Sequence, residues 1–138
     1  MKSIAVGLDG SESSWKAFRE ALRQAQYQGA ELHVVSIQES VHPSFNPSEI
    51  LEEVETARDR LEKLQEEAVR KARDAAVEVE TSILIGRPAH AMVDFIRKTG
   101  IELLIVGDTG HSSIWGTLLG NTADKIVRYA PCSVLIVR

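Results

Sequence analysis

The sequence has very little cysteine and no long apolar run, and each shortage excludes classes of protein. Cys132 is the only cysteine, so no internal disulfide can form, which favours a reducing compartment. The apolar run after Lys2 ends at Asp9 and is too short for a signal-peptide core. No stretch approaches the ~20 apolar residues of a membrane span. We therefore expect a cytoplasmic protein without a membrane partner.

The chain also lacks an excess of positive charge. Its formal net charge is −4, which makes nucleic acid and anionic membrane surfaces poor candidate partners. Apolar residues make up 43% and charged residues 26%, a balance typical of folded globular chains. Because 138 residues is an ordinary size for one domain, we expect a single domain over residues 1–138.

Short apolar segments alternate with segments of helical periodicity, which indicates a mostly parallel sheet covered by helices. The predicted strands are residues 3–8, 32–37, 77–85, 103–106 and 134–137. The predicted helices are residues 11–28, 47 to about 75, 89–99 and 122–129, with a long loop at 38–48. The sequence therefore predicts an α/β fold.

Two helices carry apolar stripes that predict how they pack. Trp15, Phe18, Leu22 and Ala25 recur on one face of the first helix, where we expect core residues. The second helix is heavily charged, and its apolar positions form a narrow stripe on an otherwise solvated surface. That stripe consists of Leu51, Val54, Leu61, Leu64 and Ala68.

The segment that suggests chemistry follows the fourth predicted strand. Gly107 and Gly110 come after the strand, and Gly120 stands before Asn121 at the start of a short helix. Glycines let backbone N–H groups approach a ligand, and the free N–H groups of a helix start favour an anion. The spacing is neither a dinucleotide fingerprint nor a Walker loop. From the residues alone, a phosphate cradle and a plain turn with Asn121 and Asp124 as a helix cap stay open.

The whole chain resembles the universal stress protein family. The pattern Gly107-x2-Gly110-x9-Gly120 is similar to the ATP-binding motif of that family, in which serine or threonine follows the last glycine. The likeness includes residues 5–11, 86–88 and 130–137. It implies a single-domain three-layer sandwich with a five-stranded parallel sheet of order 3-2-1-4-5 and helices on both faces. In that order, strands one and four flank the crevice where open α/β sheets bind ligands.

The resemblance also implies a ligand and a site. ATP or another adenine nucleotide, with Mg²⁺ or Mn²⁺, is expected to contact Asp9 through its ribose or its metal ion. Ile37 is expected to give backbone hydrogen bonds to adenine, and the glycines are expected to surround the phosphates. The full set of implied contacts is Gly7, Leu8, Asp9, Ile37, Val106, Gly107, Gly110, Gly120, Asn121, Thr122 and Ala123.

Two of these positions have a second reading. Asn121 replaces the family's hydroxyl residue, although its amide can donate to phosphate and Thr122 supplies a hydroxyl next to it. Asp9-Gly10-Ser11 is typical of a turn before a helix, a role that a ligand contact does not exclude.

The expected function is that of an ATP-binding regulatory protein with little or no turnover, because no lysine or arginine stands between Gly107 and Gly120. Unidentified protein partners are expected to respond to the nucleotide. The resemblance implies a homodimer through the apolar last strand, formed by Val134, Leu135, Ile136 and Val137. The alternatives are a nucleotide-free structural dimer, a slow ATPase and a ligase or adenylyltransferase, but the last needs a catalytic base or a cationic clamp that the sequence does not reveal.

Overall fold

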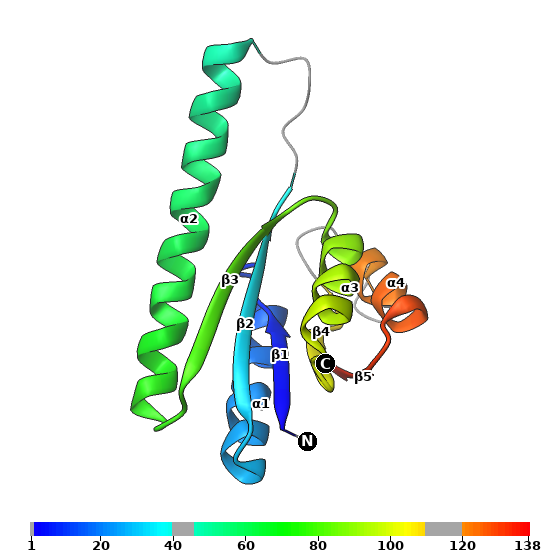
Figure 1. Cartoon of the computed structure of the whole chain (residues 1–138). Helices are drawn as coiled ribbons and strands as arrows, with labels where there is room; N and C mark the ends of the chain where they lie inside the picture. The colour runs from blue at the N-terminus through cyan, green and yellow to red at the C-terminus, as the bar shows by residue number, and fades with distance from the viewer. Residues whose placement is uncertain (1, 40–45, 110–119) are drawn as a thin grey trace.

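The computed structural model describes residues 2–39, 46–109 and 120–138, which form an α/β fold (Figure 1). The strands are β1 (Ser3–Gly7), β2 (Glu31–Gln38), β3 (Val79–Ile85), β4 (Leu103–Gly107) and β5 (Ser133–Val137). The helices are α1 (Glu12–Gln28), α2 (Pro47–Asp74), α3 (Pro88–Thr99) and α4 (Asn121–Tyr129). No helix within these described ranges is long and apolar enough to cross a membrane.

The strands form one parallel sheet in the order β3-β2-β1-β4-β5, which confirms the expected topology. Val6 of β1 is in register with Val34 of β2 on one side and with Ile105 of β4 on the other. Ile105 is in turn opposite Leu135 of β5. Strands β1 and β4 are buried through most of their length, which explains why their sequences are almost uninterrupted apolar runs.

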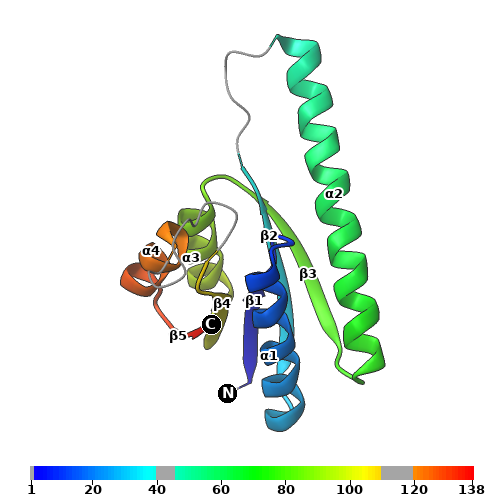
Figure 2. The same cartoon turned by 180° about the vertical axis from the view of Figure 1, so that it is seen from behind.

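Helices cover both faces of the sheet. Figure 1 is seen from the side of α3, and Figure 2, turned by 180°, from the side of α1. On the α1 and α2 side, Phe18 and Ala68 pack with Ile4 in one core cluster. On the other side, Ile96 of α3 and Ile126 of α4 belong to a second cluster. The chain is therefore a three-layer sandwich with two cores that are separated by the sheet.

The helix boundaries follow from local capping. Ser11 is the N-cap of α1, and its side chain accepts a hydrogen bond from the Ser14 N–H. Asn46 and Glu49 form a reciprocal capping box at the start of α2. Gly29 ends α1 with a φ of 63°, a left-handed conformation that favours glycine. The predicted ranges agree with the structure to within two residues at each end.

Four predictions about element ends and faces need correction. Leu8 lies just beyond β1, and β3 begins at Val79 rather than at residue 77. Trp15 is only half-buried because the buried face of α1 is centred on Ser14, Ala17, Phe18, Ala21 and Ala25. Leu51 of the predicted α2 stripe is 59% exposed, whereas Leu61 and Ala68 further along the stripe are buried.

Candidate functional site

The candidate site lies at the carboxyl ends of β1 and β4. These strands are neighbours in the sheet. After β1 the next strands, β2 and β3, are added on one side of it, whereas β5 is added on the far side of β4. Asp9 follows the end of β1, and Asp108 follows the end of β4. Open α/β sheets leave a ligand crevice at such a point.

Ser13, in the first turn of α1, contacts the residues that directly follow β4. Its hydroxyl donates to Asp108 Oδ1 at 3.2 Å and accepts from the Thr109 N–H at 3.3 Å. The two residues of this contact are separated by 95 positions in sequence, so no local pattern could have revealed it. Asp108 and Thr109 are therefore held against the start of α1.

Gly107 is required by this packing. A Cβ at Gly107 would lie 2.7 Å from the Ser13 carbonyl oxygen and 2.8 Å from its carbonyl carbon, in addition to overlapping the Ser13 hydroxyl. Gly107 was predicted because glycine admits a phosphate, but the structure gives it a packing reason that holds without any ligand. Gly110, the next glycine of the motif, lies outside the described residues.

Asp9 forms the turn that its sequence predicts. Its Oδ1 accepts a hydrogen bond from the Ser11 N–H at 2.8 Å, and Gly10 has a φ of 91°. The Asp9 N–H lies 3.3 Å from the Ser14 hydroxyl. Within the described ranges, no group of three or more histidine, cysteine or acidic side chains could hold a metal ion.

The ends of β1 and β2 are joined beside Asp9. The buried Ser36 hydroxyl donates to the Leu8 carbonyl oxygen at 2.7 Å, and the Leu8 N–H donates to the Val35 carbonyl at 2.9 Å. Ile37 and Val106, both predicted adenine contacts, belong to the same apolar cluster on the α3 and α4 side. The structure thus places the predicted base-binding residues together in one layer.

Gly7 is on that same side. A Cβ at Gly7 would lie 3.3 Å from Met92 Cε and 3.6 Å from Val106 Cγ1, so this glycine is close to the predicted base-binding residues. Met92 of α3 is a neighbour that the sequence reasoning missed. In the sequence, Met92 could be recognised only as one of the apolar residues of the predicted helix at 89–99, which gave no indication that it lies near Gly7.

Helix α4 begins next to the end of β4. The Gly120 N–H donates to the Asp108 carbonyl oxygen at 2.7 Å. Gly120 itself is the N-cap, with φ −60° and ψ 156°, and no side chain caps the helix. This corrects the alternative in which Asn121 and Asp124 form a cap, because Asn121 is already the first helical residue. The first N–H groups of α4, from Asn121 to Ala123, precede the helical hydrogen bonds and are donors suited to an anion.

The sequence reasoning also missed a cation. Arg60 of α2 donates from Nη1 to the Asp9 carbonyl oxygen at 3.3 Å. Arg128 of α4, which is nearer to the motif in sequence, forms an ion pair with Asp124 at 3.1 Å. The guanidinium group at the end of β1 therefore comes from α2, which is distant from β1 in sequence.

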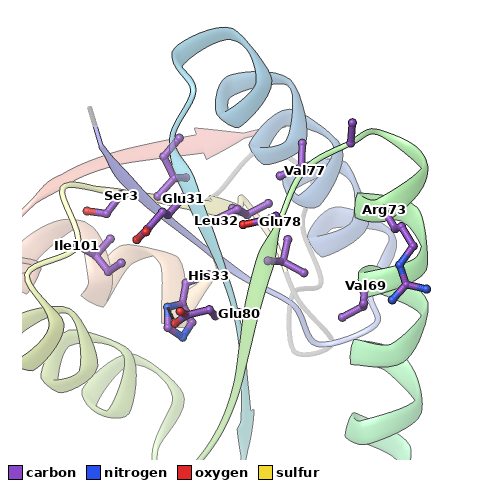
Figure 3. A pocket seen from close by; sticks show the side chains of 13 residues that line it. Ser3, Glu31, Leu32, His33, Val69, Arg73, Val77, Glu78, Glu80 and Ile101 are labelled. Atoms are coloured by element: carbon purple, nitrogen blue, oxygen red, sulfur yellow. Dashed lines mark ion pairs between the residues drawn. The ribbon is translucent and has the colours of Figure 1, made fainter.

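A cavity of about 530 Å³ lies at the opposite, amino-terminal edge of the strands. Figure 3 shows His33 and Glu80 on one side of β3, and Val69 and Arg73 of α2 on the other. His33 Nδ1 is 3.6 Å from Glu80 Oε2. Because side chains that line this cavity project from both faces of the sheet, no single small ligand would contact them all. This cavity is distinct from the candidate site.

The chain matches the model of the universal stress protein family over residues 1–138. It is 32% identical to the universal stress protein YxiE of Bacillus subtilis, with 98% of this chain and 97% of that protein covered. It is 33% identical to a universal stress protein of Thermus aquaticus, with 99% and 98% covered. The chain therefore belongs to the universal stress protein family.

Solved structures of this family have the same fold. The universal stress protein UspA from Lactobacillus plantarum has a TM-score of 0.91 at 25% identity, with 99% of this chain and 97% of that chain covered. A universal stress protein in complex with cAMP has a TM-score of 0.78 at 26% identity, with the same coverage. Some structural neighbours thus hold an adenine nucleotide.

Proposed function

We propose that this protein binds an adenine nucleotide, with ATP as the leading candidate, at the carboxyl edge of β1 and β4. The observation that carries the proposal is the start of α4, where Gly120 leaves the helix without a side-chain cap directly beside Asp108. The partial positive charge and free N–H groups of such a helix start favour phosphate. The cAMP complex of a relative at 26% identity supports an adenine nucleotide as the ligand.

The proposed roles follow the positions of the residues. Phosphate oxygens lie against the Gly120 backbone, whose N–H already donates to Asp108, and accept hydrogen bonds from Asn121 and Thr122. Asp9 contacts the ribose or a phosphate-bound Mg²⁺ or Mn²⁺. The adenine lies by Ile37 and Val106, which share the apolar layer next to Gly7. Gly107 acts indirectly. Because it has no side chain, Ser13 of α1 can approach closely and hold Asp108 by a hydrogen bond.

The nucleotide acts as a signal in this proposal, with little or no turnover. Fast phosphoryl transfer needs cations at the transferred group and an oriented nucleophile. No lysine or arginine occurs between Gly107 and Gly120. Arg128 is paired with Asp124, and Arg60 donates to the Asp9 carbonyl oxygen at the end of β1. These features favour a regulatory protein over a metabolic enzyme.

The protein is further proposed to be a homodimer through β5. This strand is at the edge of the sheet, and its apolar residues from Val134 to Val137 are only half-buried in the single chain. An exposed apolar edge invites pairing with another strand, and a two-fold axis would make the two copies of β5 antiparallel.

Titration calorimetry with Mg-ATP, AMP and cAMP tests the binding proposal. Native protein should bind at least one of these nucleotides, and Gly120→Val should abolish binding. Gly120 has φ −60° and ψ 156°, a conformation that valine adopts without backbone strain, so the variant is designed to block close approach of the ligand to this backbone. Arg87→Val is the matched control, because Arg87 is also an uncapped N-cap with extended backbone, at the start of α3. Absence of binding to the native protein at millimolar nucleotide would refute the proposal.

A further inference from the structure

The amino-terminal turns of α2 extend beyond the sheet. Figures 1 and 2 show this end of α2 past the carboxyl ends of β2 and β3. The 28 residues of α2 span roughly 42 Å at 1.5 Å per residue. The 7 residues of β3 span only roughly 23 Å. A long part of this helix therefore has no strand beneath it.

The apolar stripe of α2 continues into this overhang. Leu61 is buried against the sheet, whereas Ile50 and Val54, two to three turns earlier, are half-buried and Leu51 is 59% exposed. Ile85, at the end of β3, is 68% exposed. It lies in register with Gln38, whose amide donates to the Val54 carbonyl oxygen at 3.1 Å. We call Ile50, Leu51, Val54 and Ile85 the α2 tip patch.

The charged residues in the first turns of α2 all have one sign. Residues 47–57 contain four glutamates and no lysine or arginine, whereas residues 58–74 contain six basic and five acidic residues. In that second part, Arg58 pairs with Glu62 and Lys71 with Glu67. Among the described residues, Glu52, Glu53 and Glu55 form no ion pair. An apolar strip with unpaired carboxylates beside it repels a second copy of itself and is complementary to a basic partner.

We propose that the α2 tip patch is a docking surface for a basic amphipathic helix of a partner protein. The apolar face of that helix would cover Leu51 and Ile85, and its lysine or arginine side chains would pair with the three unpaired glutamates. This is helix recognition by an exposed apolar strip with charges that set the orientation. The proposal requires no nucleotide, so it does not depend on the proposed binding site.

The probe is a fluorescein-labelled 18-residue helical peptide of leucine and lysine, titrated with full-length protein by fluorescence anisotropy. A peptide with the same leucines and with glutamate in place of lysine is the control ligand. The basic peptide should bind and the acidic one should not. Leu51→Ser should weaken binding about tenfold through the loss of one buried leucine. Tyr27→Ser is its matched control, because Tyr27 is 89% exposed and stands near the end of α1, and this end of α1 is far from the start of α2 (Figure 1).

The charge requirement has its own matched pair of variants. The triple change Glu52→Gln, Glu53→Gln and Glu55→Gln should weaken binding about tenfold, as the loss of three exposed ion pairs predicts. The triple change Glu62→Gln, Glu66→Gln and Glu67→Gln alters net charge by the same amount on the other part of α2 and should leave affinity unchanged. Equal losses in both triple variants would show non-specific attraction and overturn the proposal.

Two further outcomes would overturn it by identifying another occupant. If Leu51→Ser lowers the melting temperature by several degrees, the patch is covered within the chain itself. If Leu51→Ser instead dissociates a dimer in light scattering, a second copy covers the patch. Failure of the basic peptide to bind at millimolar protein concentration would refute the docking surface directly.

Discussion

Replacing Gly107 with alanine tests the link between the glycine motif and the start of α1. The new Cβ would meet the Ser13 carbonyl oxygen at 2.7 Å and the carbonyl carbon at 2.8 Å. Both are backbone atoms in the first turn of α1, so no side-chain rotation can relieve the clash. The first turn of α1 or the end of β4 must move instead.

The cost follows from this geometry. Inserting one carbon into a packed site destabilises proteins by about 1–3 kcal/mol, and a clash with backbone belongs at the upper end of that range. For a chain of this size, about 3 kcal/mol corresponds to a melting temperature lowered by roughly 9 °C. Thermal unfolding followed by circular dichroism, without added nucleotide, measures this shift directly.

Gly7→Ala is the matched control for this prediction. Its Cβ would meet the Met92 methyl carbon at 3.3 Å, and a methionine side-chain end can move by the few tenths of an ångström required. The expected loss is below about 1 kcal/mol. A Gly107→Ala protein that melts within 1 °C of the native protein would refute the packing explanation and restore ligand approach as the reason for the glycine.

Four other outcomes are expected. Steady-state phosphate release from ATP should stay well below ~1 s⁻¹, and faster turnover that Asp9→Ala abolishes would identify an ATPase. Ile136→Lys should convert a dimer into a monomer in light scattering, and a monomeric native protein at tens of micromolar would contradict the β5 interface. Gln38→Ala should lower the free energy of unfolding by about 1–2 kcal/mol in urea, because Gln38 is buried and hydrogen-bonded to α2, whereas the exposed Gln26→Ala should change it by less than about 0.5 kcal/mol. Burial raises the pKa of the Cys132 thiol, so at neutral pH it should react with a disulfide reagent more slowly in folded than in urea-unfolded protein, and equal rates would contradict this.

The periodicity of apolar residues, together with glycine, proline and helix-cap residues, was sufficient to locate the helices and strands. Apolar runs such as 103–106 could be read as buried strands, and Asn46-Pro47 correctly indicated the start of α2. The strand order was a different matter, because periodicity does not specify which strands are neighbours. That order came from the resemblance to a family, and the structure confirms it.

Packing at the ends of elements could not be predicted. The stripe from Leu51 to Ala68 is uniform in sequence, but the sheet covers only its later part, because β3 is much shorter than α2. Likewise, Gly107 gives the same sequence signal whether it admits a phosphate or a helix. The packing reason became visible only through the approach of Ser13, which comes from a distant part of the chain.

Arg60 shows why cations near a candidate phosphate site must be counted in space. The glycine segment has no cation of its own, but Arg60, which is 51 positions from Asp9 in sequence, donates to the Asp9 carbonyl oxygen. That bond joins a charged donor to a neutral acceptor, and a phosphate oxygen would be the stronger acceptor. Stabilising a bound phosphate in this way raises affinity, but it raises the rate only if the contact strengthens in the transition state. The Asp9 carboxylate accepts the Ser11 N–H, and this hydrogen bond forms the turn that precedes α1. A guanidinium group at the end of β1 is therefore consistent with a protein that holds its nucleotide and does not consume it.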